Sequence, residues 1–163
     1  MRPNQNGIDL TKHSEGCVLM VYLDVVGVPT AGYGHVIRLI DGEFHVNDPI
    51  TQAQADQWLE DDLALAMTAV RRYAPDLTTD NQRAALCDFT FNLGPSNLGR
   101  LVKDGNGVPS EIVQQLQFWT RAGTQHPRGL KIRRALERDL FLQPDDVPMP
   151  ADWLTRRDHD FGG

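Results

Sequence analysis

The chain has 163 residues, of which 40% are hydrophobic and 23% are charged, the balance of a soluble globular domain rather than of a disordered or fibrous chain. Sixteen Lys and Arg against 22 Asp and Glu give a net charge of −6, which argues against a protein that binds nucleic acid with its whole surface. No apolar run approaches the roughly 18 residues that span a bilayer, and the polar N-terminus lacks the apolar stretch of a secretory signal, so we expect no membrane insertion.

The first elements in chain order are a short helix and a small sheet. Residues 8–15 have a helical pattern that Gly16 ends, because glycine suits the left-handed position after a helix. Between residues 18 and 44, strand-forming Val, Leu, Tyr and Ile alternate with turn-forming Gly, Pro and Asp-Gly. The sequence therefore predicts two or three short antiparallel strands in a minor lobe.

A long helix is predicted next. Residues 55–73 carry apolar side chains at three-to-four-residue spacing, and Thr51 stands three residues before Gln54, close to a capping box. Such a helix is about 28 Å long, enough to bridge two lobes.

The remaining helices form a larger lobe. Asp80 is expected to cap a helix that is apolar around most of its circumference, which is typical of a buried core helix, and Gly94-Pro95 is expected to end it. Two more helices are predicted over residues 111–119 and 130–141, and an irregular tail from residue 145.

Glu15, Asp24 and Thr30 flank the junction of the first helix and the sheet. Inverting cleavage of a glycosidic bond needs a neutral carboxylic acid on one side of the bond and a carboxylate about 6.5–9.5 Å away that activates water. A hydroxyl group can hold that water in line. Taken by themselves, three such residues are more often surface or capping groups, so the residue types and spacing leave both interpretations open.

The segment from Glu15 to His35 resembles the active-site signature of the phage-type lysozymes, the endolysins of glycoside hydrolase family 24. That signature has Glu, eight residues, Asp or Cys, five residues, Thr, and then Gly-Tyr-Gly-His, which is residues 32–35 here. Residues 51–63, 84–94, 118–123 and 129–138 resemble later segments of the family, so the resemblance extends from about residue 8 to 142. Pro29 departs from the pattern and predicts a sheet edge or a bulge; the stretch after residue 94 also matches weakly.

The resemblance implies an α+β, mainly helical, lysozyme-like fold in a single domain over residues 1–163, with the active-site cleft between two lobes. Its parts would be a small antiparallel β lobe at residues 16–50 and a helical lobe at residues 1–15 and 75–145. An inter-lobe helix would cover residues 51–74, and an irregular tail residues 146–163.

By the same resemblance the chain cleaves the β-1,4 bond between N-acetylmuramic acid and N-acetylglucosamine of peptidoglycan. Glu15 would be the general acid, Asp24 would orient and activate water, and Thr30 would position that water. A lytic transglycosylase, a non-catalytic wall-binding or phage-structural module, and a nucleic-acid binder are the alternatives. No cofactor is implied, and the protein is expected to be a monomer that stays in the host cytoplasm until a holin or another export route gives it access to the wall. A prophage or secreted-effector origin fits the sequence equally well.

Other side chains have competing interpretations. His35 invites a catalytic or metal role, but the resemblance implies structural support through a hydrogen bond to Asp62. Val36 and Phe91 are substrate-contact candidates, although packing in the core or the wall of a cleft is the commoner role of such side chains. No metal site is expected, because the remaining histidines show no metal-ligand spacing: His13, His45, His126 and His159.

The aromatic and sulfur side chains near these positions are assigned mostly to the core. Trp58 and Trp119 lie on apolar helix faces and are expected to be buried, whereas Trp153 could stack on a sugar. Cys17 is expected to be buried and inert, the commoner state of a free cysteine, although a reactive thiol beside Glu15 is the alternative. Whether Cys17 pairs with Cys87 stays open.

Positive charge is concentrated in one segment. Residues 121–138 contain six basic residues and one acidic residue, a net +5, so the rest of the chain carries −11. The helical spacing predicts that Lys131, Arg134 and Arg138 point outward, while the packing positions are Ile132, Ala135, Leu136 and Leu140. The segment is either a solvated helix face or a patch that attracts an anionic wall.

Overall fold

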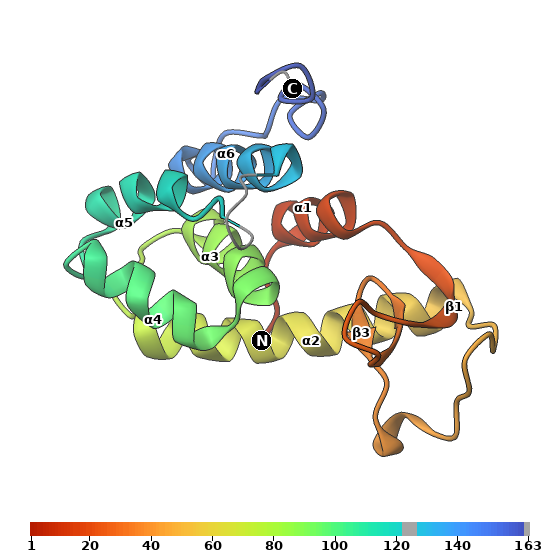
Figure 1. Cartoon of the computed structure of the whole chain (residues 1–163). Helices are drawn as coiled ribbons and strands as arrows, with labels where there is room; N and C mark the ends of the chain where they lie inside the picture. Colours follow the sequence, from red (N-terminus) through yellow and green to blue (C-terminus); the bar gives the residue numbers. More distant parts are fainter. Residues whose placement is uncertain (122–126, 162–163) are drawn as a thin grey trace. The chain divides into compact units, whose positions relative to one another are not determined.

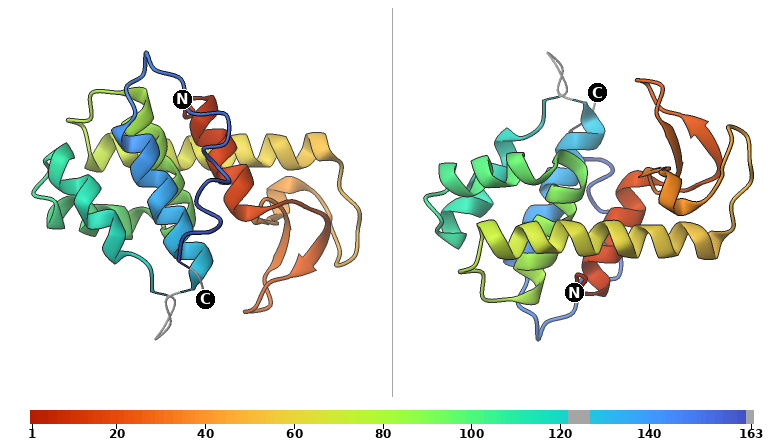
Figure 2. Two further views of the ribbon diagram at one scale, coloured as in Figure 1. Left: turned by 90° about the horizontal axis from the view of Figure 1, so that it is seen from above. Right: turned by 90° about the horizontal axis from the view of Figure 1, so that it is seen from below.

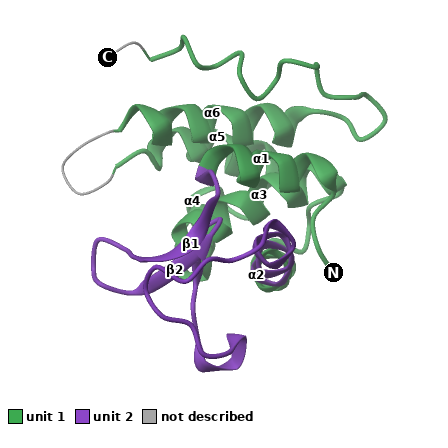
Figure 3. Cartoon of the chain, turned by 90° about the vertical axis from the view of Figure 1, so that its right-hand side faces the viewer, with its two compact units in different colours: residues 1–14, 63–163 green, residues 15–62 purple. Residues whose placement is uncertain are grey.

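The computed structural model describes residues 1–121 and 127–161, and the chain divides into two units (Figure 3). Unit 1 comprises residues 1–14 and 63–163, and unit 2 comprises residues 15–62. His126, residues 122–123 of the segment that resembles the family's Trp motif, and the last two residues of the tail lie outside the described residues. The predicted α+β, mainly helical class with a small antiparallel sheet is confirmed (Figure 1).

Unit 2 contains a three-stranded antiparallel sheet in the order β1-β2-β3, formed by Val18–Leu23, Pro29–Gly32 and His35–Val36. Tyr22 pairs with Thr30, and Thr30 pairs with Val36, so these three residues form one row across the sheet. A 3-10 turn, η1 (Leu39–Asp41), follows β3.

The sequence predicted that Pro29 lies at a sheet edge or in a bulge, and this prediction was wrong. Pro29 is the first residue of the central strand, β2, where a strand tolerates proline because the missing N–H falls at the start of the ladder. The irregular register occurs instead in β1, between Val18 and Tyr22.

α2 (Gln52–Tyr73) begins in unit 2 and ends in unit 1. The Thr51 hydroxyl accepts a hydrogen bond from the backbone N–H of Gln54 at 3.1 Å, so the predicted cap is present. β2 approaches this helix closely at Gly32, where a Cβ atom would lie 3.1 Å from the Cβ of Ala55. Gly32 also has a φ of +63°, so both space and backbone conformation favour glycine there.

Unit 1 is helical. Besides the C-terminal part of α2 it contains most of α1 (Gln5–Glu15), α3 (Asp80–Leu93), α4 (Pro95–Asp104), α5 (Pro109–Gln115), the 3-10 turn η2 (Leu116–Phe118) and α6 (Arg128–Leu142). α3 packs against both α4 and α6, and α5 contacts both of those helices (Figure 2). The middle of α3 is buried from Ala84 to Thr90, as its apolar composition predicted.

α4 is a helix that the sequence did not predict. The sequence predicts only a helix end at Gly94-Pro95, but Pro95 is also the first residue of the next helix, where its fixed φ and missing N–H are harmless. The buried face of α4 consists of Leu98, Leu101 and Val102.

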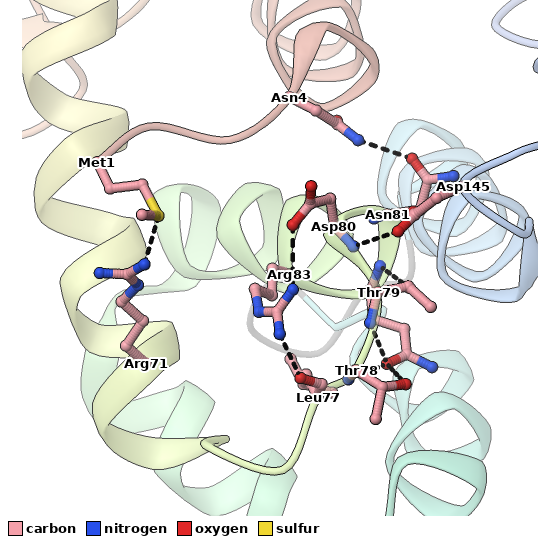
Figure 4. Close-up of polar contacts among 11 residues, drawn as sticks. Met1, Asn4, Arg71, Leu77, Thr78, Thr79, Asp80, Asn81, Arg83 and Asp145 are labelled. Atoms are coloured by element: carbon pink, nitrogen blue, oxygen red, sulfur yellow. Dashed lines mark hydrogen bonds and ion pairs between the residues drawn. The ribbon is translucent and has the colours of Figure 1, made fainter.

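The sequence predicted Asp80 as the cap of α3, but the cap is Thr79 (Figure 4). The Thr79 hydroxyl accepts from the backbone N–H of Gln82 at 3.1 Å, and the Gln82 side chain accepts in return from the Thr79 N–H at 3.3 Å. The free N–H groups of Asp80 and Asn81 both donate to the Asp145 carboxylate at 2.9 Å. The residues after α6 are therefore held at the N-terminus of α3.

A buried ion pair joins α3 to α6. Arg133 donates from Nε and Nη2 to the two carboxylate oxygens of Asp88 at 2.9 Å, and the Thr11 hydroxyl donates to the same carboxylate at 2.8 Å. Burial opposes ionisation, but the charge and hydrogen bonds of Arg133 outweigh it, so the pKa of Asp88 lies below its ordinary value.

Arg134 does not point outward, contrary to the sequence prediction. Its side chain is only 1% exposed, and its Nη2 atom lies 2.8 Å from Glu137 Oε1 and 2.7 Å from Asn92 Oδ1. The guanidinium also lies over the ring of Phe89, 4.9 Å from its centroid. Lys131 and Arg138 are partly exposed, so the predicted cationic face is smaller than the sequence indicated.

Trp58 is buried, as predicted, whereas Trp119 is only half-buried and meets the Phe89 ring edge-on at 5.5 Å. Trp153 is also buried, so its ring is not available to stack on a sugar. Cys17 is exposed rather than buried, while Cys87 is buried, and both are free. In the described part of the chain, no helix is both long enough and apolar enough to span a membrane.

Candidate active site

Glu15 is the last residue of α1 and lies beside the turn between β2 and β3. Gly16 follows it with a φ of +67°, which ends the helix and starts the chain toward β1. The Glu15 Oε2 atom lies 3.7 Å from the place that a Cβ atom of Gly34 would occupy, and the Glu15 side chain is exposed. The glycine-rich turn therefore leaves space beside the carboxylate.

Asp24 organises the hairpin between β1 and β2. Its Oδ1 atom accepts from the backbone N–H groups of Val26 and Val28 at 2.9 and 2.8 Å. Gly27, with a φ of +83°, completes the turn by donating its N–H to the Asp24 carbonyl at 3.0 Å. Within unit 2, no hydrogen bond reaches the second carboxylate oxygen, Oδ2, so that oxygen is available to a water molecule or a ligand.

The side chains of Thr30 and Asp24 both hydrogen-bond to the backbone of the same residue, Val28. The Thr30 side chain is buried, and its hydroxyl donates to the Val28 carbonyl at 2.9 Å. Because that bond uses the hydroxyl hydrogen, the lone pairs of Thr30 Oγ1 are left to accept. Val28 thus holds the carboxylate with its N–H and the hydroxyl with its carbonyl, which fixes both groups on the same hairpin.

Tyr22 is a member of this cluster that the sequence analysis missed. It pairs with Thr30 across the sheet and stands two residues before Asp24. Burial raises the pKa of the Tyr22 phenol, and the negative charges of Glu15 and Asp24 raise it further. The phenol therefore lies in the field of both predicted catalytic carboxylates. The two-residue spacing between Tyr22 and Asp24 was the signal that could have placed Tyr22 there, because residues i and i+2 of an extended chain face the same side.

His35 is buried in unit 2 between two carboxylates. Its Nδ1 atom lies 2.7 Å from Asp62 Oδ2, the partner that the family resemblance implies, and its Nε2 atom lies 3.2 Å from Asp41 Oδ2. The ring stacks on Trp58 with 4.7 Å between centroids. Asp41 also accepts from the Arg38 N–H at 2.7 Å, so the imidazole ties η1 and α2 to the sheet. Asp41 is a partner that the sequence analysis did not identify.

The two substrate-contact candidates lie in different units. Val36 is the third residue of the Tyr22–Thr30–Val36 row and is 41% exposed. Phe91 lies on α3 in unit 1 and is half-buried. Among residues 1–121 and 127–161, no group of three or more His, Cys, Asp or Glu side chains is placed to hold a metal ion.

Comparison with solved structures places this fold among the lysozyme-like hydrolases. An endolysin from Escherichia coli O157:H7 phage FAHEc1 superposes with a TM-score of 0.77 at 31% identity, over 92% of this chain and 98% of that one. The muramidase domain of SpmX from Asticaccaulis excentricus gives a TM-score of 0.76 at 29% identity, over 88% of this chain and 99% of that one.

Comparison of the sequence identifies the family within this fold class. Residues 12–137 match the family model described as phage lysozyme. The endolysin of Acyrthosiphon pisum secondary endosymbiont phage 1 is 32% identical over 148 residues, which are 86% of this chain and 98% of that relative. The chain belongs to the phage lysozyme family. It is therefore a lysozyme, an enzyme that hydrolyses the glycan of bacterial peptidoglycan.

Proposed function

We propose that Glu15, Asp24 and Thr30 are the catalytic residues of this lysozyme and that the reaction inverts the configuration at the sugar. A water molecule would donate one hydrogen bond to Asp24 Oδ2 and the other to Thr30 Oγ1. The observation that carries this proposal is the pair of hydrogen bonds to Val28, which occupies Asp24 Oδ1 and the Thr30 hydroxyl hydrogen and leaves two acceptors on one hairpin.

In this mechanism Glu15 protonates the oxygen of the leaving sugar while Asp24 takes a proton from the attacking water. The negative charge of Asp24 also stabilises the oxocarbenium-like sugar in the transition state. Tyr22, beside both carboxylates, is a neutral group that can stay protonated throughout the reaction. The products are one new reducing end and one new non-reducing end for each bond cleaved.

We further propose that His35 and Asp62 support the site structurally, since the imidazole contacts two carboxylates and a tryptophan ring and has no free edge for a substrate. Val36 is proposed as a substrate contact from the exposed end of the Tyr22–Thr30 row. Phe91, half-buried on α3, is proposed as a second substrate contact.

The biological role that fits these residues is lysis of a phage host. We propose that the enzyme acts as a monomer on the wall, and that it accumulates in the host cytoplasm until a holin or another export route gives access to the wall. Expression in bacteria with and without a co-expressed holin tests this part: lysis that is equally rapid without any membrane permeabilisation would contradict the need for a separate route.

Purified peptidoglycan provides the test of the chemistry. Wild type is expected to release reducing ends whose fresh anomeric configuration, followed by proton NMR, is inverted. Products with 1,6-anhydro ends would instead identify a lytic transglycosylase. Glu43→Gln is a matched control for Glu15→Gln, because Glu43 lies in the same unit and its side chain is 89% exposed; that control should retain full activity.

A further inference from the structure

One pocket in unit 1 is lined by cations and lies outside the proposed catalytic cluster. It has a volume of about 390 Å³, within the range of small-ligand sites. Its main lining residues are Gln117, Thr120, Lys131, Arg134, Arg138 and Phe161. The three basic residues recur at positions i, i+3 and i+7, so they share one face of α6.

The described residues that line this pocket do not neutralise its positive charge. No acidic residue is among them. Lys131 and Arg138 make no hydrogen bond or ion pair within the described part of unit 1. The nearby Asp139 is already paired with Arg156 and Arg157 at 2.9 and 2.8 Å. The pocket therefore presents two cations without a counter-ion and a third, Arg134, whose partner is Glu137.

Unpaired donors at the same wall point to a ligand. Arg134 makes an ion pair with Glu137 and a hydrogen bond with Asn92 through Nη2. Its buried Nε and Nη1 atoms, the buried Nε of Arg138 and both carboxylate oxygens of Glu137 have no hydrogen-bond partner among the described residues. Buried donors are nearly always paired in proteins, and an oxyanion supplies several acceptors at once. Burial raises the pKa of Glu137 well above its ordinary value and lowers the pKa of Arg134, so the positive charge of the pocket comes mainly from Lys131 and Arg138.

We propose that this pocket is an oxyanion site that takes a carboxylate or phosphate group. Lys131 and Arg138 supply the charge that attracts the anion, and Thr120 and Gln117 supply polar contacts at its edge. The Ala135 methyl and the Phe161 ring form the apolar part of the wall, which suits an anion attached to a small organic group more than a bare ion. In the cell wall, such groups are the free carboxylates of the stem peptides, and this choice of source alone rests on the proposed function.

Calorimetric titration at low ionic strength tests the site. The probes are inorganic phosphate, a stem peptide with free carboxylates, and the same peptide with its carboxylates amidated. The pocket variant is Lys131→Gln/Arg138→Gln. The matched control is Lys103→Gln/Arg128→Gln, which removes the same charge from exposed positions outside the pocket, one of them on α6 itself. Measurements in a Glu15→Gln background keep binding independent of hydrolysis.

We expect saturable binding to wild type, binding at least about tenfold weaker in the pocket variant, and a change of less than about twofold in the control. Binding of the free-carboxylate peptide but not of the amidated one assigns the site to wall carboxylates, and binding of phosphate alone assigns it to a phosphate group. The inference is overturned if no probe binds saturably, or if both double variants lose affinity equally. If the pocket variant does not fold, each single substitution should still weaken binding by about threefold.

Discussion

Asp24 has two roles that one pair of substitutions can separate. Its Oδ1 atom holds the hairpin through the N–H groups of Val26 and Val28, and its Oδ2 atom is assigned to the catalytic water. Asparagine keeps an oxygen that can accept the two N–H bonds but removes the charge and the base. Alanine removes both functions. We therefore expect Asp24→Asn and Asp24→Ala to be equally inactive but unequally stable.

The sizes of these effects follow from the contacts. A hydrogen bond to a charged group contributes about 1.5–3 kcal/mol, but the Val26 N–H is exposed and water can replace its partner, so Asp24→Ala should lose about 2 kcal/mol. For a chain of this size that is a fall of about 4–8 °C in Tm, against about 1–3 °C for Asp24→Asn. Loss of the base should lower the rate by about 10²–10⁴ in both variants.

Two assays read the two roles. Thermal unfolding followed by circular dichroism gives Tm, and release of reducing ends from purified peptidoglycan gives the rate. Retention of more than about one tenth of the wild-type rate by Asp24→Asn would refute the assignment of the base. Equal Tm values for the asparagine and alanine variants would show that the Oδ1 bonds do not stabilise the hairpin.

Three other predictions concern single groups. Asp88→Asn leaves Arg133 buried without a counter-charge and should lower the free energy of unfolding in urea by about 3–5 kcal/mol. Because the pKa of Asp88 is lowered in the folded state, its contribution to stability is present above about pH 4 and is lost as the pH falls further. The stability of the variant should therefore fall less steeply below about pH 4 than that of wild type, and an equally steep fall would contradict this. His35→Asn should lower Tm while leaving the rate per folded molecule within a few-fold, and a loss of rate without loss of Tm would instead make the imidazole functional. Spectrophotometric titration should show a pKa of the Tyr22 phenol above the ordinary tyrosine value near 10. In an Asp24→Asn variant, which removes one of the two nearby charges, that pKa should move toward the ordinary value. An unchanged pKa would place the phenol away from Asp24.

Local sequence patterns predicted the sheet, the long helix and the buried helix because each depends on apolar spacing and turn residues within a short window. They failed where two signals compete in one place. Pro95 can end one helix or begin another, and the structure shows it beginning α4. Thr79 and Asp80 are both good caps, and the reciprocal partner Gln82 decides for Thr79.

Side-chain environments that depend on other segments were beyond the sequence. The helical spacing predicts that Arg134 lies on the exposed face of α6. Instead, Asn92 and Phe89 of α3 and Glu137 of α6 contact its side chain, and no local pattern reveals those partners. The residues of the candidate site were found through a motif, but the motif could not show that Asp24 Oδ1 and the Thr30 hydroxyl both bind Val28. The separation of structural and catalytic atoms within one carboxylate came only from the hydrogen bonds.

The most direct test of the proposed chemistry is product analysis of purified peptidoglycan treated with wild type, Glu15→Gln and the control Glu43→Gln. The proposed mechanism predicts new reducing ends from wild type and from the control. It predicts none above background from Glu15→Gln, although that variant should unfold at the wild-type temperature, since Glu15 is exposed at the end of α1. Release of reducing ends by folded Glu15→Gln at the wild-type rate would contradict the assignment of Glu15 as the acid.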